Sequence, residues 1–257
     1  MINYKDQEIV PMPTYGRRPI SNAANMGLVF NKYFPWNINK EISKSHGWIN
    51  AYIKEFNNIH SKDEYNLRYR KMVRKSNGLL FEMKCMSDLI IGMGNAHPME
   101  NGFTFDHTQG LPFIPGTTIK GIWKASEQAK AKEEKKESKN NAKEDKKVDD
   151  FVFLDAIPLS VKLRLDIMTP HYQPYYSSGG TSPPGDWYNP IPIQFITVSK
   201  GSKFLWGILS RTKDRNGLQK DNLKRVTSQI KEHLLNFGIG GKTAVGYGRI
   251  EMRKVGG

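Results

Sequence analysis

The sequence has one cysteine, Cys85, among its 257 residues, and it has no apolar run of about eighteen residues. A single thiol cannot form an internal disulfide framework, and such scarcity is typical of a reducing compartment. The six histidines are scattered, so that they offer no zinc-binding spacing with that one cysteine. The first ten residues are polar, unlike a signal peptide. We therefore expect a cytoplasmic protein without a membrane partner, a metal or another cofactor.

Hydrophobic residues are also scarce, at 38% of the chain, whereas charged residues make up 25%. The length suits one large domain or two small ones with much polar surface. The net charge of +14 is unevenly distributed. Residues 127–150 carry eight lysines and eight acidic residues, whereas residues 200–257 carry thirteen basic and four acidic ones. A basic C-terminal part is typical of a face that binds a polyanion, although a solvated lysine-rich surface has the same composition.

Five glycines fall between residues 238 and 248, interspersed with Lys242, Thr243 and Tyr247 and followed by Arg249. Glycine permits positive φ and a close approach to a ligand, and successive exposed N–H groups can bind an anion. Dinucleotide and Walker-type loops lie between a strand and the following helix. This segment follows a helical pattern and precedes a strand, which excludes both of those nucleotide sites. A glycine-rich hairpin at a sheet edge is the structural alternative.

The periodicity of the apolar residues predicts alternating strands and helices. Strands are predicted at 79–86, 103–105, 151–154, 159–165, 193–198, 204–209 and 247–252. Helices are predicted at 21–34, within 41–75, from 117 onward, and at 223–234 with Gly238 following it as a cap. The two strands before the last helix should form a hairpin through Gly201. The order predicts an α+β fold of ferredoxin-like or RRM-like plan, with an antiparallel sheet and both main helices on one face.

Several segments decorate this plan. Residues 1–76 should form an extended and helical N-terminal region packed on the core, and residues 77–257 the RRM-like domain. Residues 127–148 have almost nothing to bury; a solvated helix extension is one alternative, but a flexible charged insertion is favoured. Residues 169–192 are rich in proline and tyrosine, and we expect a long structured loop or a protruding hairpin there.

Three separated stretches carry a family resemblance. Residues 113–121 resemble the signature that opens the first helix in RAMP proteins of CRISPR systems, and residues 238–249 resemble their C-terminal glycine-rich loop. Between them, residues 154–158, 165–172 and 189–193 resemble the family that supplies the sixth subunit of type III-B (Cmr) effector complexes. The resemblance covers most of residues 79–252 and keeps the expected order.

The resemblance implies a non-catalytic backbone subunit of an RNA-guided antiviral complex. Such a subunit lies near the 3′ end of the guide RNA (crRNA) and holds guide and target RNA without cutting either. Its other partners would be the Cmr-type backbone and capping subunits. In such complexes target cleavage belongs to a different backbone subunit, and cyclic-oligonucleotide synthesis to the large subunit.

Candidate RNA contacts follow from what single-stranded RNA requires: backbone clamps and cations for phosphates, and aromatic rings for bases. In the glycine-rich segment the candidates are Gly238, Gly240, Gly241, Lys242, Thr243, Gly246, Tyr247, Gly248 and Arg249. Elsewhere they are Arg17, Arg18, Thr117, Thr118, Lys120, His171, Tyr172, Tyr175 and Tyr176. Helix capping would equally explain the threonines, and packing on their own domain would explain the tyrosines.

Two other functions must be weighed against RNA holding. An endoribonuclease would need an acid–base pair, and the loop after the first predicted strand offers Asp88, His97, Asp106 and His107. No two of these have a diagnostic spacing, so that a loop or protein contact is the favoured interpretation. A pure assembly module would use the basic face to meet an acidic neighbour instead of RNA.

Overall fold

The computed structural model describes residues 25–32, 42–58, 63–97, 101–137, 150–185, 187–190, 192–211 and 218–255. Its helices are α1 (Met26–Lys32), α2 (Ile42–Phe56), α3 (Asp63–Lys75), α4 (Gly116–Glu137), α5 (Gln173–Ser177) and α6 (Leu218–Asn236). Its strands are β1 (Leu79–Cys85), β2 (Phe151–Phe153), β3 (Ile157–Ser160), β4 (Leu163–Met168), β5 (Ile193–Val198), β6 (Lys203–Ser210) and β7 (Ile250–Lys254). None of the helices in these ranges is long and apolar enough to cross a membrane.

The main sheet has the ferredoxin-like order. Its strands run β2-β6-β1-β7, with β3 also paired to β6, and all of these pairs are antiparallel. The first strand, β1, is central: its Met83 faces Phe204 of β6 on one side and Met252 of β7 on the other. With α4 after β1 and α6 after β6, the chain follows the β-α-β-β-α-β plan that the sequence predicts.

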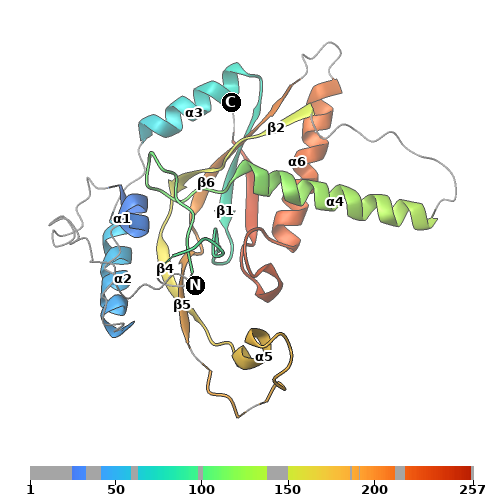
Figure 1. Ribbon diagram of the computed structural model, residues 1–257. Helices are drawn as coiled ribbons and strands as arrows, with labels where there is room; N and C mark the ends of the chain where they lie inside the picture. The colour runs from blue at the N-terminus through green and yellow to red at the C-terminus, as the bar shows by residue number, and fades with distance from the viewer. Residues whose placement is uncertain are drawn as a thin grey trace.

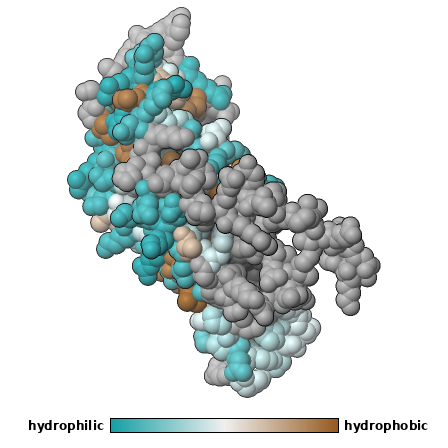
Figure 2. Space-filling view, turned by 90° about the vertical axis from the view of Figure 1, so that its left-hand side faces the viewer, coloured by the Kyte–Doolittle hydropathy of each residue, from teal (hydrophilic) through white to brown (hydrophobic). Residues whose placement is uncertain are grey.

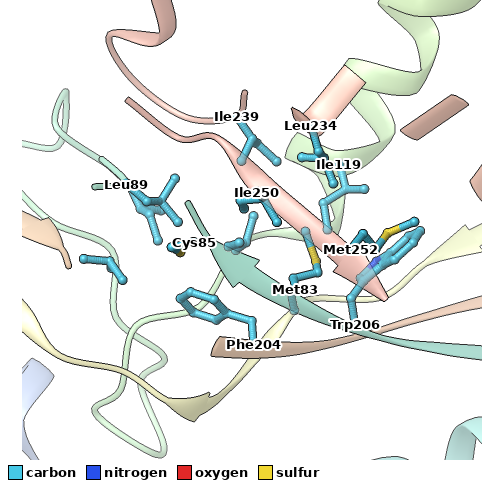
Figure 3. Close-up of a cluster of buried hydrophobic side chains, with 14 of the residues drawn as sticks. Met83, Cys85, Leu89, Ile119, Phe204, Trp206, Leu234, Ile239, Ile250 and Met252 are labelled. Carbon is cyan, nitrogen blue, oxygen red and sulfur yellow. The ribbon is translucent and has the colours of Figure 1, made fainter. Parts of the chain in front are cut away.

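Helices cover both faces of this sheet (Figure 1). On one face α4 and α6 bury side chains such as Ile119 and Ile230 against Met83 of β1, and Figure 3 shows part of this core. On the other face α3 packs Val73 against Leu80 of β1 in a smaller cluster. The alternation along β1 sends successive side chains to opposite faces, so that both layers are apolar where they meet the sheet.

The N-terminal helices are tied to the sheets by polar contacts as well as by packing. Asn57, just after α2, accepts a hydrogen bond from the Leu163 N–H at 2.7 Å and donates one to the Leu163 carbonyl at 2.9 Å. Tyr69 of α3 donates to the Asp155 carbonyl at 2.8 Å and accepts from the Gly207 N–H at 2.9 Å. Burial raises the Tyr69 pKa, so that the hydroxyl stays a donor near neutral pH.

The side of the molecule formed by these helices is mostly hydrophilic. Figure 2 looks onto this side, and among its described residues hydrophobic areas are small and separate. Large exposed hydrophobic residues on these helices are Leu28, Leu67 and Met72. No broad apolar surface gathers there among the residues that the structure describes.

Three sequence predictions for strands are wrong. The strand predicted at 159–165 is divided between β3, which pairs with β6 in the main sheet, and β4, which belongs to the two-stranded sheet. Strands β5 and β6 do not form a hairpin with each other: β5 pairs with β4 in a separate two-stranded sheet, from Leu163 opposite Val198 to Met168 opposite Ile193. Both edges of β6 are already occupied, by β1 on one side and by β2 and β3 on the other. Residues 103–105 form no strand and make only an isolated bridge, Phe105 to Pro112, although Phe103 and Phe105 are both buried in the core.

The charged insertion begins as a helix. Helix α4 continues through Glu137, which corrects the expectation of flexibility for residues 127–137. Alanine, lysine and glutamate dominate this part and are strong helix formers. The extension is also anchored, because Glu127 accepts a hydrogen bond from Gln229 of α6 and lies 3.8 Å from the Arg225 guanidinium. Residues 138–149 lie outside the described residues.

Candidate nucleic-acid interface

Residues 238–249, the glycine loop, leave the end of α6 and lead into β7. The Gly238 N–H donates to the His233 carbonyl at 3.1 Å, and the φ angle of Gly238 is +79°, which confirms the predicted helix cap. The next side chain, Ile239, is 1% exposed and points into the core beside Leu234 and Ile250 (Figure 3). The loop is therefore anchored by a buried side chain at its start.

Three glycines of the loop, Gly238, Gly240 and Gly248, lie too close to the protein's own backbone to carry a Cβ, most severely the last two. A Cβ on Gly240 would lie 2.2 Å from the Ile90 carbonyl oxygen, and one on Gly248 would lie 1.9 Å from the Ile239 carbonyl oxygen. Both residues have positive φ, at +88° and +77°. The Gly248 N–H also donates to the Asp88 carbonyl at 2.8 Å. The close approach that the sequence predicts at these glycines is thus made to the chain itself, and their contact with RNA stays a prediction.

The tip of the loop combines unpaired backbone donors with an exposed lysine. Lys242 is exposed and left-handed, with φ +55°, and it precedes a 3₁₀ turn over Thr243–Val245. The N–H groups of Val245 and Gly246 close this turn onto the carbonyls of Lys242 and Thr243. Within the described part of the chain, the N–H groups of Lys242, Thr243 and Ala244 have no hydrogen-bond partner. Three consecutive free donors beside a lysine side chain suit a phosphate oxygen.

Tyr247 turns away from this tip. Its hydroxyl donates to Asp166 Oδ2 of β4 at 2.8 Å, and its ring packs edge-on against Phe195 of β5, with centroids 6.2 Å apart. Burial, and then the hydrogen bond to the Asp166 carboxylate, raise the pKa of Tyr247 to about 12. Tyr247 therefore attaches the loop to the β4–β5 hairpin.

The backbone of Arg249 is hydrogen-bonded to the segment that follows β1. Its N–H donates to Ser87 Oγ at 3.0 Å, and its carbonyl accepts from the Met86 N–H at 2.7 Å. The side chain is half-buried, and its buried Nη1 has no hydrogen-bond partner among the described residues. Of the two loop cations named from the sequence, Lys242 is thus the exposed one.

The substitution Tyr247→Phe should lower the free energy of unfolding by about 1 kcal/mol at pH 7, since it removes one hydrogen bond to a carboxylate. The unfolded tyrosine ionises near pH 10, whereas the folded one ionises near 12. The stability that Tyr247 adds is therefore complete below pH 10 and declines between pH 10 and 12. Urea denaturation at pH 7 and pH 11 should show a smaller difference at the higher pH.

Tyr176→Phe is the matched control, because the Tyr176 side chain is 72% exposed. It should leave the unfolding midpoint unchanged at both pH values. Equal stability of Tyr247→Phe and the unsubstituted protein at pH 7 would show that the Asp166 contact does not hold the loop.

Asp88, which follows β1, is held by several contacts within the protein. Asp88 Oδ1 accepts from the Lys200 N–H at 2.8 Å, and Oδ2 lies 3.4 Å from the Arg164 guanidinium. Its side chain is only 13% exposed. Asp88 Oδ2 also accepts from the Thr197 hydroxyl of β5 at 3.5 Å, and the Asp88 carbonyl accepts from Gly248, so that Asp88 joins the glycine loop to β4 and β5.

The other acid and base candidates make contacts with residues around them, and Asp106 and His107 line one pocket of about 230 Å³. Asp106 Oδ1 accepts from the N–H groups of Thr108 and Gln109 at 2.9 and 2.7 Å, which closes a local turn. His97 stacks on Phe30 with ring centroids 4.0 Å apart, and burial lowers its pKa. His107 and His171 are exposed. No group of three or more His, Cys, Asp or Glu side chains in the described ranges could hold a metal ion.

The threonines at the start of α4 are not its cap. The Gly116 N–H donates to Asp155 Oδ1 at 2.7 Å, so that a residue between β2 and β3 caps the helix. A Cβ at Gly116 would lie 2.2 Å from the Phe153 carbonyl oxygen, which explains the glycine. Thr117 is exposed and Thr118 is half-buried, as is Lys120. The alternative that capping accounts for these threonines is wrong.

A groove of about 800 Å³ is lined by residues of both segments that carry the family resemblance, the helix-opening signature at 113–121 and the glycine loop at 238–249. It lies between the start of α4, the end of α6, the glycine loop and the segment after β1. Its lining residues are Ile90, Ile91, Gly92, Thr104, Pro115, Thr118, Gly121, Ile122, Ala125, His233, Phe237, Gly238, Ile239, Gly240, Gly241 and Thr243. Thr118 at the start of α4 and Thr243 of the glycine loop thus line the same groove, although 125 positions separate them in the sequence.

Sequence reasoning missed two members of this groove, His233 and Phe237. Their rings have centroids 5.1 Å apart, and the Phe237 side chain is 63% exposed. The sequence position of Phe237 could have indicated its exposure. Phe237 lies just beyond the last turn of α6, and the buried apolar face of that helix already ends at Leu234.

The proline- and tyrosine-rich loop connects β4 to β5 and protrudes from the body of the molecule, as predicted (Figure 1). It contains the short helix α5, in which Tyr175 and Tyr176 meet edge-on with centroids 5.4 Å apart. Tyr172 is at the border of exposure, at 36%, whereas Tyr176 and the unpredicted Trp187 are each 72% exposed. Arg17 and Arg18 lie outside the described residues.

Comparison with known proteins identifies one relative over nearly the whole chain and another over about two thirds of it. The CRISPR system Cmr subunit Cmr6 of Pyrococcus furiosus is 28% identical over 344 aligned positions, covering 95% of this chain and 98% of that protein. Cmr6 of Saccharolobus solfataricus is 25% identical over 181 positions, covering 68% of this chain and 58% of that protein.

A solved structure shares the fold. One chain in the cryo-EM structure of the type III-B Cmr-beta complex bound to cognate target RNA superposes with a TM-score of 0.59 at 21% identity. That superposition covers 86% of this chain and 78% of the other. The RAMP superfamily matches residues 82–251, from within β1 into β7. The chain is homologous to Cmr6 and belongs to the RAMP superfamily.

Proposed function

We propose that this protein is a non-catalytic, RNA-binding backbone subunit of a type III-B CRISPR effector complex. In that complex it holds guide RNA and target RNA near the 3′ end of the guide, beside other backbone and capping subunits in the cytoplasm. The observation that carries the proposal is the similarity to Pyrococcus furiosus Cmr6, which extends over 95% of this chain and 98% of that protein.

The geometry of the glycine loop supports RNA holding. Phosphates would meet the three free N–H groups at the tip and the exposed Lys242 ammonium, without any need to read bases. The surrounding C-terminal part of the chain, residues 200–257, carries nine more basic than acidic residues, thirteen against four. Such a field attracts a polyanion from a distance and favours association.

The tyrosine-rich loop supports a second contact region. Tyr176 and Trp187 expose aromatic rings on a protruding segment, where they can stack on bases that phosphate contacts do not engage. The stem of that segment is fixed to the glycine loop through Asp166 and Tyr247. Phosphate binding and base stacking would then occur on two parts of the molecule that are connected through this contact.

Purification of the tagged full-length protein from its own cells tests the assembly. Mass spectrometry should identify other Cmr-type subunits, and sequencing should identify an RNA of guide length. A chain that elutes alone, without RNA, would contradict the proposal.

Within the purified complex, alanine at Asp106, His107 or His171 should leave the target-cleavage rate unchanged, because the proposed role is to hold RNA and the Asp106 carboxylate is engaged by Thr108 and Gln109. The rate should be measured in single turnover with bound RNA saturating, with and without divalent metal. A variant that loses cleavage while its RNA occupancy stays complete would establish an endoribonuclease instead.

A further inference from the structure

We infer that the groove between α4, α6 and the glycine loop receives an unpaired base of the single-stranded RNA whose phosphate is held at the loop tip. This inference rests on the proposed RNA binding and adds a base-binding pocket to it. The pocket is indifferent to sequence in its main contact, which is stacking on the ring of Phe237.

The groove has the size and the lining of a small-ligand site. Its volume of about 800 Å³ falls within the roughly 300–1,000 Å³ typical of such sites. Ile90, Ile91 and Ile122 supply apolar walls. The polar side chains of the lining are the threonine hydroxyl groups and one imidazole, from Thr104, Thr118, Thr243 and His233. A planar aromatic heterocycle with polar edges fits this combination better than a charged group does.

The exposed ring of Phe237 gives the groove a surface on which a base can stack. Phe237 remains 63% exposed at the end of α6, while its neighbour in the helix pattern, Leu234, is fully buried. The His233 ring packs beside it, and burial lowers the pKa of His233, so that this imidazole is neutral at pH 7. The two rings are tilted by 40° to each other, so that the exposed Phe237 ring is the face on which a base can stack.

Charge complementarity selects RNA as the occupant of the groove. Thr243 both lines the groove and contributes one of the three free N–H groups at the loop tip. A nucleotide whose phosphate sits on those donors, beside Lys242, has its base on the groove side of the same residue. An apolar side chain from a partner protein would fill the groove but would leave these donors and the lysine charge unmatched.

The test compares two oligonucleotides of about twelve nucleotides with equal charge, one a mixed-sequence RNA and one without bases. Fluorescence anisotropy with the full-length protein should show tighter binding of the base-bearing RNA. Phe237→Ala should reduce that affinity by about tenfold and leave the affinity for the abasic strand unchanged. Lys242→Glu should weaken both strands by a similar factor.

Leu235→Ala is the matched control, because Leu235 is 51% exposed on the same helix end but does not line the groove. It should change neither affinity. If Phe237→Ala retains the full preference for bases, the pocket is wrong while RNA holding stands. If neither strand binds the unsubstituted protein, or Lys242→Glu is without effect, the proposed function itself fails, and the pocket fails with it.

Discussion

Replacing Lys242 with glutamate should lower the affinity of the protein for unrelated single-stranded RNAs by about tenfold or more. The change removes one cation and adds one anion beside the three free N–H groups at the loop tip. Each lost phosphate contact also reduces the release of counterions, so that the dependence of log affinity on log salt should flatten by about one unit. Titrations at several salt concentrations with two RNAs of unrelated sequence measure both effects.

Lys75→Glu is the control of equal charge change. Lys75 ends α3, which covers the opposite face of the sheet from α4 and α6. This variant should lose little affinity and keep its salt dependence. A similar loss in both variants would mean that net charge alone attracts RNA, and an effect on one RNA sequence only would indicate base reading rather than a phosphate clamp.

Gly248→Ala should cost about 3 kcal/mol or more of the free energy of unfolding. The new Cβ would lie 1.9 Å from the Ile239 carbonyl oxygen, and the φ angle of +77° disfavours any side chain. Relief of this clash would move the loop away from Asp88, whose carbonyl accepts the Gly248 N–H. Thermal or urea denaturation measures the loss.

Gly94→Ala provides the comparison, because a Cβ there meets nothing within 4 Å and the φ angle of Gly94 is not positive. Its unfolding midpoint should match that of the unsubstituted protein. If Gly248→Ala were equally harmless, the glycine loop would be more adaptable than its contacts with Ile239 and Asp88 indicate.

The plan of the fold could be predicted from the sequence because β1 and the two main helices carry strong local patterns. Leu80 and Met83 alternate between the two faces of the sheet, and Val226, Ile230 and Leu234 follow one helix face. These patterns depend only on neighbours along the chain.

Pairing between strands depends on which edges are free, and that information is not local. The segments 193–198 and 204–209 are separated by a short turn containing Gly201, so that a hairpin was the natural prediction. Strand β6 has no free edge in the structure, and β5 pairs with β4 across the long tyrosine-rich connection instead. For residues 127–137 the flexible insertion was favoured over the helical alternative because composition alone does not reveal the contact between Glu127 and α6.

The glycine loop was recognised as a feature, but the use of its glycines was not foreseen. A glycine needed for contact with a ligand and one needed for contact with the chain's own carbonyl look the same in sequence. Gly240 and Gly248 are of the second kind, whereas Gly246, with φ +98°, has open space around its Cα. The groove itself was not predictable, since Thr118 and Phe237 meet only after α4 and α6 have packed on the sheet.

The most direct measurement of the central claim is crosslinking of the full-length protein to single-stranded RNA that contains 4-thiouridine, followed by mass spectrometry of the linked peptides. The account predicts crosslinks within residues 233–249, at the end of α6 and in the glycine loop, and fewer of them after Lys242→Glu. Crosslinks confined to α3, with none in the glycine loop, would contradict it.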